Sequence, residues 1–189
     1  MPAKNDKYRK VPLTGATIFY LIITVVIVVG ISLLLIPNQQ ERIFRRYRDA
    51  NIGGGETLQR DHNLRQVSVS RLLRVIDNAA PGERIIVYFG SEDCPACRPR
   101  VRQVVQLSQD RGVERIYYLR DHNINLTPLT DRFDLPMGEV TPEVWVFMDG
   151  EMILSSRERR FLNDEPNPPR STKWETFLRN YVFNPQHFN

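Results

Sequence analysis

Cysteine and histidine are scarce in this chain. Its 189 residues include two cysteines, Cys94 and Cys97, and three histidines, His62, His122 and His187, which are scattered. A structural zinc site takes about four ligands, and no second cysteine pair is present to complete one. A disulfide that closes so short a loop would also stabilise a fold little. We therefore expect no metal site, no bound cofactor and no disulfide scaffold.

A strong net charge is also missing from most of the chain. The formal net charge is +4, and residues 1–37 supply +3 of it because four basic residues there face a single aspartate. The remainder is nearly neutral, and the arginines in 98–115 are interleaved with Asp110 and Glu114. Nucleic-acid-binding domains typically carry a basic patch with aromatic residues. None stands out here, nor does an internal repeat, so we expect no nucleic acid among the partners.

A long hydrophobic run is present near the N-terminus. Residues 13–36 contain 24 residues without a charged side chain, and a helix of that length spans roughly 36 Å, against about 30 Å for a bilayer core. A secretory signal peptide would have a shorter apolar region followed by small residues, whereas a proline and three amides follow here. A buried soluble helix fits less well, because the run has no polar face. We predict a transmembrane helix over 13–36.

The charges that flank this run leave its orientation open. Four basic residues lie in the N-terminal tail, residues 1–12, and four arginines lie between residues 42 and 48. The positive-inside rule therefore favours neither side. A cysteine pair is most useful where disulfides persist, which is outside the cytoplasm. We expect the tail inside the cell and the C-terminal domain outside it.

Residues 37–63 are predicted to be a juxtamembrane segment and linker. The basic cluster at 42–48 contains apolar and aromatic residues, so it can either lie on anionic headgroups or extend the anchor helix. Three consecutive glycines at 53–55 cost backbone entropy in any regular element and indicate a linker. We therefore place the globular domain at residues 64–184.

Hydrophobic patterns after residue 64 predict alternating helices and strands. One helical face is marked at 69–76, and another helix is expected from the cysteines to residue 108, bent by Pro99. Short apolar runs predict strands at 85–89, 116–119 and 144–148, and Asp149-Gly150 predicts a hairpin turn into 152–154. Thr172 and Glu175, spaced as a capping box, predict a last helix to residue 182. This order indicates an α/β fold.

The same order, with Cys-x-x-Cys opening the helix after the first buried strand and a proline entering the late hairpin, resembles the thioredoxin-like family. Residues 87–97 resemble its active-site strand and turn, and Val140, Thr141 and Pro142 resemble its cis-proline loop. The resemblance implies a three-layer α/β/α fold preceded by one transmembrane helix. It also implies that Thr141 and Pro142 lie against the cysteines and offer backbone groups to an extended substrate chain.

The cysteine pair itself has the spacing of a redox site. A cysteine at a helix N-terminus faces unsatisfied N–H groups and the positive end of the helix dipole, which stabilise its thiolate. Cys94 is therefore the expected nucleophile, and Cys97 is placed to resolve a mixed disulfide or to form the intramolecular one. Among their neighbours, Glu92 and Asp93 disfavour a Cys94 thiolate and Arg98 favours it, so the direction of the pKa shift stays open.

Two positions depart from the family pattern. Thioredoxin itself usually has a buried acid in the preceding strand and an aromatic residue before the first cysteine, and the matching residues here are Tyr88 and Asp93. The Pro-Ala between the cysteines and the arginine after them look more like the small accessory thiol oxidoreductases of bacterial cell envelopes, including those that accompany bacteriocin secretion.

Two hypotheses about function follow. The first is a membrane-anchored thiol-disulfide oxidoreductase that exchanges disulfides with exported or envelope proteins and uses a membrane redox partner. The second is a non-catalytic thioredoxin-like binding module of a secretion or envelope assembly complex. The intact cysteine pair with Pro142 favours the first, because a binding module needs neither a resolving thiol nor a helix-terminal nucleophile. Oxidation and reduction of the substrate both remain open within it.

Overall fold

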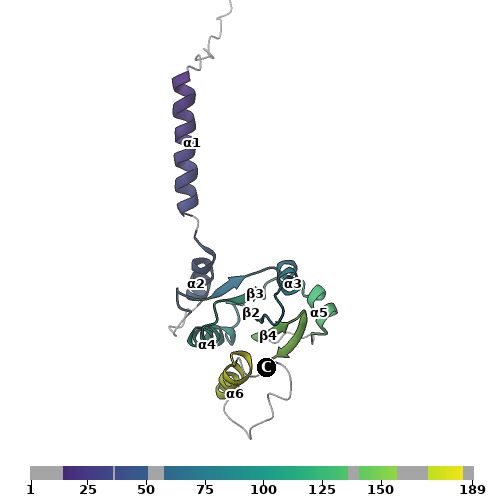
Figure 1. Ribbon diagram of the computed structural model, residues 1–189. Helices are drawn as coiled ribbons and strands as arrows, with labels where there is room; N and C mark the ends of the chain where they lie inside the picture. Colours follow the sequence, from purple (N-terminus) through teal and green to yellow (C-terminus); the bar gives the residue numbers. More distant parts are fainter. Residues whose placement is uncertain (1–14, 36, 51–57, 136–140, 157–169, 185–189) are drawn as a thin grey trace, which may run out of the picture. The chain divides into compact units, whose positions relative to one another are not determined.

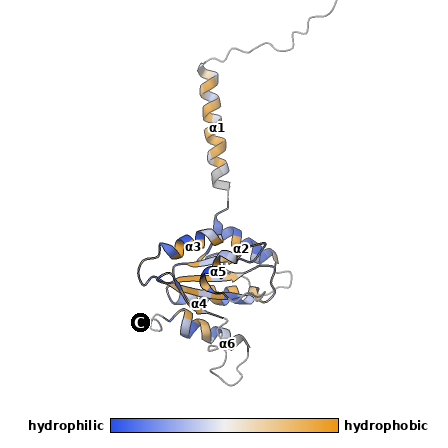
Figure 2. Cartoon of the chain, turned by 90° about the vertical axis from the view of Figure 1, so that its right-hand side faces the viewer, coloured by the Kyte–Doolittle hydropathy of each residue, from blue (hydrophilic) through white to orange (hydrophobic). Residues whose placement is uncertain are grey.

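The computed structural model of the chain describes residues 15–35, 37–50, 58–135, 141–156 and 170–184. The chain divides into two compact units, Met1–Asn38 and Gln39–Asn189. The first unit contains helix α1, Gly15–Leu35, and Figure 2 shows hydrophobic residues along most of it. Among the described residues, this is the helix that is long and apolar enough to cross a membrane, and none of its 18-residue apolar window is buried. The predicted apolar helix is therefore present.

The second unit begins with an amphipathic helix, which lies in the segment predicted to be juxtamembrane. Helix α2, Gln39–Ala50, buries Ile43 and Tyr47 in the same core cluster as the strands. The compact unit thus begins at Gln39, whereas we had expected it to begin near residue 64. The difference arises because two apolar residues one turn apart make a buried face among many charges. The glycine-rich linker predicted at 53–55 lies outside the described residues.

A five-stranded sheet forms the centre of the second unit. The strands are β1 (Leu64–Gln66), β2 (Ile85–Gly90), β3 (Ile116–Arg120), β4 (Glu143–Met148) and β5 (Glu151–Ser155). Their order across the sheet is β1-β3-β2-β4-β5, in which β1, β3 and β2 run parallel and β4 and β5 form an antiparallel hairpin beside β2. Asp149 and Gly150 turn that hairpin with positive φ angles of 53° and 80°, as its two-residue loop requires.

Helices cover both faces of this sheet (Figure 1). They are α3 (Val69–Asp77), α4 (Cys97–Asp110), α5 (Thr127–Phe133) and α6 (Arg170–Phe177), and α6 continues as a π-helical segment, Leu178–Val182. Buried residues of α3 and α5 pack on one face, and those of α2, α4 and the π-helical segment pack on the other. The predicted three-layer α/β/α arrangement is therefore confirmed. Helix α5 was missed, because its proline had suggested an irregular connection.

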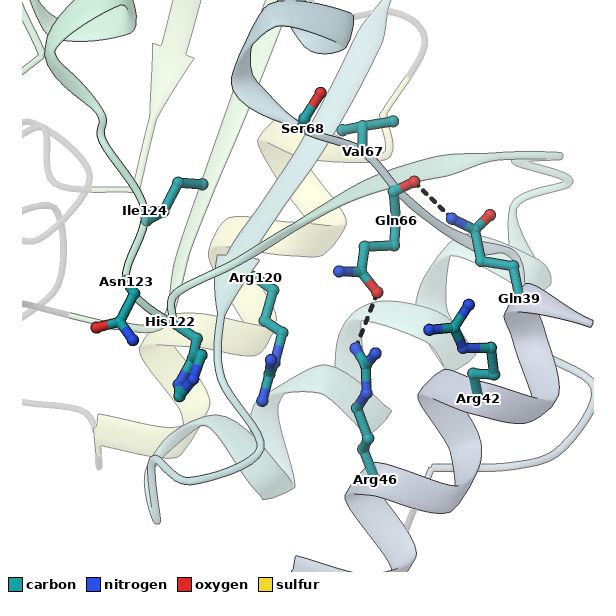
Figure 3. A pocket seen from close by; sticks show the side chains of 10 residues that line it. All are labelled: Gln39, Arg42, Arg46, Gln66, Val67, Ser68, Arg120, His122, Asn123 and Ile124. Atoms are coloured by element: carbon teal, nitrogen blue, oxygen red, sulfur yellow. Dashed lines mark hydrogen bonds between the residues drawn. The ribbon is translucent and has the colours of Figure 1, made fainter. Parts of the chain in front are cut away.

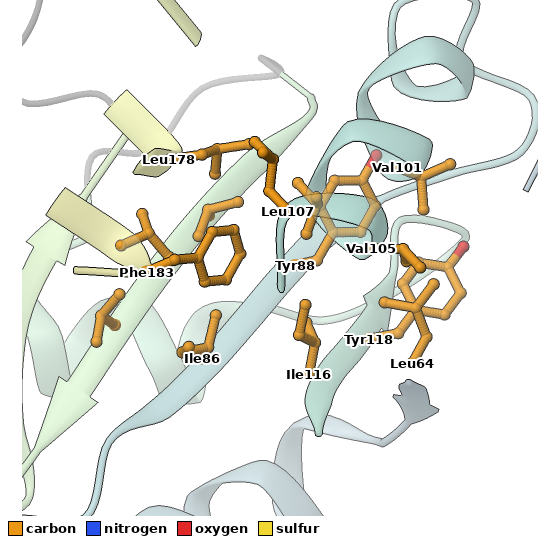
Figure 4. Packing of buried hydrophobic residues seen from close by; sticks show 14 of the residues in the cluster. Leu64, Ile86, Tyr88, Val101, Val105, Leu107, Ile116, Tyr118, Leu178 and Phe183 are labelled. Atoms are coloured by element: carbon orange, nitrogen blue, oxygen red, sulfur yellow. The ribbon is translucent and has the colours of Figure 1, made fainter. Parts of the chain in front are cut away.

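The core follows the alternation of side chains along the strands. On β2, Ile86 and Tyr88 belong to the cluster under α4, whereas Val87 and Phe89 belong to the cluster under α3. Figure 4 shows strand residues of the first cluster packed beside Val101 of α4. Every residue of β2 is buried, as predicted for a central strand.

Two helices begin at residues that differ from the predicted starts. Helix α4 begins at Cys97, so Pro99 is its third residue. Backbone N–H groups in the first turn have no partner within the helix, and the missing N–H of Pro99 therefore gives no cause for a bend. Helix α6 begins at Arg170, before the start predicted at Thr172. The proline-containing stretch at 161–170, to which the sequence assigns no role, lies outside the described residues except for Arg170.

Candidate functional site

The cysteine pair lies in the turn between β2 and α4. Cys94 and Cys97 form a disulfide with a Cα–Cα distance of 5.2 Å. The Cys97 N–H donates to the Cys94 carbonyl oxygen at 3.0 Å and lies 3.2 Å from the Cys94 sulfur, so Cys94 closes the turn that leads into α4. Cys97 is fully buried, whereas Cys94 is partly exposed. Of the two cysteines, Cys94 is therefore the one that solvent reaches.

The loop before β4 lies next to this disulfide. The carbonyl oxygen of Thr141 is 3.7 Å from Cys94 Sγ, and the Thr141–Pro142 peptide bond is cis. The pairing of β2 with β4 brings this loop to the cysteines, because Phe89 near the end of β2 is opposite Glu143 at the start of β4. Thr141 and Pro142 are thus brought to the cysteines as the resemblance implied, and Val140 lies outside the described residues.

The charged residues of the turn, Glu92, Asp93 and Arg98, differ in their burial and in their hydrogen-bond partners. Glu92 is buried, 5% exposed, and its carboxylate accepts hydrogen bonds from both Nε and a terminal nitrogen of Arg120. Arg98 Nε donates to the Glu92 carbonyl oxygen at 3.0 Å, so it holds the backbone of the turn. Asp93 is exposed, and its N–H donates to Ser91 Oγ at 3.0 Å. Asp93 therefore faces solvent while Glu92 faces the interior.

The pairing with Arg120 decides the charge state of Glu92. Burial alone would raise the pKa of this carboxyl, but the hydrogen bonds from Arg120 and the positive charges of Arg120 and Arg46 outweigh it and lower the pKa. The same hydrogen bonds raise the pKa of Arg120. Glu92 is thus an ionised carboxylate with an arginine counterion. Its negative charge is compensated locally, which weakens the effect on Cys94 that the sequence suggested.

Three tyrosines form a buried group behind the disulfide. Tyr88 donates its hydroxyl hydrogen to the Cys97 carbonyl oxygen at 3.1 Å. Tyr47 donates to Tyr118 at 3.4 Å, and Tyr118 donates to Glu92 at 3.4 Å. Burial raises the pKa of all three phenols well above the ordinary value. They are therefore neutral hydrogen-bond donors that connect α2, β2 and β3 to the turn.

The role of Tyr88, which departs from the pattern of the thioredoxin-like family, follows from its hydrogen bond. A neutral phenol donates a hydrogen bond but does not accept a proton near neutral pH, so Tyr88 supports the first turn of α4 and does not replace an acid. Sequence reasoning missed Tyr47, Tyr118 and Arg120. The signal for Tyr47 was its spacing of four residues from Ile43 among arginines, which marks one buried helix face.

Among the described residues, no group of three or more histidine, cysteine, aspartate or glutamate side chains could hold a metal ion. His62 is buried, with Nε2 2.9 Å from the Gln40 carbonyl oxygen and Nδ1 accepting the Leu64 N–H at 3.3 Å. It therefore joins α2 to the start of β1. His122 follows the end of β3, and His187 lies outside the described residues.

No protein-family model and no curated protein matches the chain. Similar solved structures include Chlamydomonas reinhardtii thioredoxin f2, with 18% identity and a TM-score of 0.41 over 52% of this chain and 89% of that one. They also include a chain of the complex of ferredoxin:thioredoxin reductase with thioredoxin f2 (14%, 0.42, 51% and 83%). A third is the short form of thioredoxin f from spinach chloroplast (13%, 0.40, 54% and 84%).

The order and directions of the five strands, with a Cys-x-x-Cys turn between β2 and α4, identify the architecture. The fold is thioredoxin-like. A disulfide in Cys-x-x-Cys spacing at the N-terminus of α4 in this fold supports thiol-disulfide redox chemistry in general.

Proposed function

We propose that the chain is a membrane-anchored thiol-disulfide oxidoreductase that exchanges disulfides with exported or envelope proteins. The observation that carries the proposal is the asymmetry of the disulfide, in which Cys94 is partly exposed and Cys97 is fully buried. A partner protein can approach the sulfur of Cys94 but not that of Cys97. Such an arrangement suits a nucleophile with a resolving partner.

The exchange is a pair of sulfur displacements. When the pair is oxidised, a substrate thiolate attacks Cys94 Sγ, the bond to Cys97 breaks, and Cys97 leaves as a thiolate. A second substrate thiolate then attacks the substrate sulfur of the mixed disulfide and releases Cys94. The substrate loses two electrons and the cysteine pair gains them. In the opposite direction Cys94 attacks a substrate disulfide and Cys97 resolves the mixed disulfide.

Residues around the turn serve this exchange in distinct ways. The N-terminus of α4 stabilises the Cys94 thiolate through the N–H groups of its first turn. The N–H of Cys97, which also donates to the Cys94 carbonyl oxygen, lies 3.2 Å from the sulfur. Thr141 and Pro142, beside Cys94, offer backbone groups to an extended substrate segment. Arg98 holds the turn, and the exposed carboxylate of Asp93 opposes the thiolate in part.

In this proposal helix α1 anchors the domain in a membrane. Helix α1 has 21 residues, which rise about 32 Å, close to the thickness of a bilayer core. Oxidation of substrate thiols suits a compartment in which disulfides persist, and this favours an extracytoplasmic domain with the N-terminus inside. A membrane redox partner would then restore the oxidation state of the cysteine pair after each exchange.

The proposal is tested by trapping substrates in cells. The Cys97→Ala variant retains Cys94 but cannot resolve, so exported proteins should accumulate as mixed disulfides that reductant releases. The Cys94→Ala variant is the matched control and should trap none. Absence of trapped proteins with Cys97→Ala would overturn the catalytic role and favour a binding module. C-terminal reporter fusions that are active in the cytoplasm would overturn the orientation and the oxidase direction.

A further inference from the structure

A cavity of about 410 Å³ opens between α2 and the ends of β1 and β3. Its lining includes Arg42 and Arg46 of α2, Arg120 and His122 after β3, and no aspartate or glutamate. Figure 3 shows the two α2 arginines reaching toward the strand side, where Arg120 and His122 lie. We call this cavity, with its four basic side chains, the arginine pocket. None of its lining residues belongs to the cysteine turn, residues 91–97.

The positive charge of the pocket is only partly balanced. Arg120 is paired with Glu92. Arg46 donates to the neutral side-chain oxygen of Gln66 at 2.9 Å, and Arg42 makes no ion pair with any residue in the described part of the chain. Guanidinium groups that share a cavity repel one another unless an anion lies between them. The pocket thus has an excess of positive charge that a bound anion would neutralise.

The wall of the pocket is already ordered. Gln39 Nε2 donates to the Gln66 carbonyl oxygen at 2.6 Å, so the start of α2 is fixed to β1 and Arg42 and Arg46 project from a docked helix. Ser68, which also lines the cavity, is the N-cap of the nine-residue helix α3. A helix N-terminus adds free N–H groups and a partial positive charge. Little rearrangement is needed before an anion can bind.

We propose that the arginine pocket binds a phosphate group. Arginine presents a planar fork of donors that matches phosphate oxygens, and forks arriving from two sides can surround a tetrahedral anion. The volume leaves room for the organic part of a phosphate ester. The inference concerns a second site and does not depend on the proposed redox function.

Two sources could supply this phosphate group. Gln39 at the rim follows Leu35, the last residue of α1, by four positions in the sequence, so headgroups of anionic phospholipids are one source. Soluble phosphate compounds of the same compartment are the other. Both present the same oxygens to the arginines, and they differ in whether lipid can compete with free phosphate.

The test uses the full chain in dodecyl maltoside micelles, which contain no phosphate. Inorganic phosphate is titrated at constant ionic strength and its binding is followed by calorimetry. We expect saturable binding that weakens at least about tenfold in Arg42→Gln. The matched control is Arg48→Gln, which removes the same charge from the same helix outside the pocket. Thermal unfolding of each variant confirms that the fold is retained.

Added lipid then identifies the source. If phosphatidylglycerol in the micelles suppresses phosphate binding and phosphatidylcholine does not, the site takes anionic headgroups. If neither lipid competes, the site takes a soluble phosphate compound, and both results support a phosphate site. Absence of phosphate binding by the wild-type chain would overturn the proposal. So would an equal loss in Arg42→Gln and Arg48→Gln, because diffuse charge on α2 would then explain the binding.

Discussion

The disulfide turn and the α2 side of the sheet are two neighbouring regions built in opposite ways. The turn, residues 91–97, uses short-range contacts such as that of Cys97 with Cys94 and exposes one sulfur. The α2 side draws buried polar groups from α2, β2 and β3, with Tyr47, Tyr88 and Tyr118 as its members. The two regions meet at Glu92. A reactive group can therefore be accessible while the structure that holds it is buried.

The groups that react and the groups that hold them in place also lie in different regions. Groups that would react, Cys94 and Cys97, lie within four consecutive residues. Groups that hold them come from elements up to 71 residues apart, as in the hydrogen bond from Tyr47 to Tyr118. Changes on the α2 side should therefore alter stability more than the chemical step.

The largest expected effect comes from breaking the ion pair at which the regions meet. Arg120→Gln leaves the carboxylate of Glu92 buried without its counterion, and we expect the free energy of unfolding to fall by about 3 kcal/mol. The side chains of Glu92 and Arg120 are 7% and 24% exposed, so solvent replaces the lost arginine poorly. Urea unfolding of the full chain in dodecyl maltoside measures the change.

The double variant Glu92→Gln/Arg120→Gln is the control for this effect. It removes the unpaired charge, so its stability should exceed that of Arg120→Gln. If both variants lose the same free energy, packing of the arginine stem and not charge pairing holds the turn. If Arg120→Gln has no effect, the boundary between the two regions would have to be drawn elsewhere.

A smaller effect is expected at Tyr88. Tyr88→Phe removes the hydrogen bond to the Cys97 carbonyl and should lower the free energy of unfolding by about 1 kcal/mol. Because the phenol is neutral and contacts the main chain, the pH profile of disulfide exchange should not change. Tyr117→Phe, at a more exposed position on the same sheet, should change stability less. A shifted pH profile in Tyr88→Phe would show that this phenol takes part in proton transfer.

Much of the fold could be predicted because its signals are local. The run at 85–89 and the turn Asp149-Gly150 identify a buried strand and a hairpin from a few adjacent residues. Helix α2 was not recognised, because its two buried residues, Ile43 and Tyr47, are outnumbered by charges that a solvated or membrane-surface helix would also carry. Only packing against the sheet distinguishes these cases.

The same reasoning applies to the site. The cysteine motif and the loop at Thr141 were predicted because each has a recognisable short pattern. Arg120 has no such pattern, since it is one of many arginines and its role depends on the parallel pairing of β2 with β3, in which Gly90 is opposite Arg120. This pairing brings Arg120 beside Glu92. Sequence alone also left the role of Glu92 incomplete, because its counterion is 28 residues away.

The smallest effect is expected at His62, which joins α2 to the start of β1. Burial lowers the pKa of this histidine below its ordinary value of 6.5, and the hydrogen bond to the Gln40 carbonyl offsets the shift only in part. Its contribution to stability is therefore complete above pH 6.5 and is lost as the pH falls through 6.5 toward the lower pKa of the folded state. Protonation of Nδ1 would also remove the acceptor for the Leu64 N–H.

We expect the unfolding free energy of the full chain to fall between pH 7.5 and pH 5.5, by less than the loss expected in Tyr88→Phe. In His62→Gln most of this fall should disappear, since the amide does not titrate. Glu92 does not contribute in this range, because its pKa is lowered from 4.5. An unchanged slope in His62→Gln would assign the effect to other groups. An acid-sensitive contact at His62 would loosen α2 while the disulfide, which does not titrate, stays closed, so the two regions would respond separately to pH.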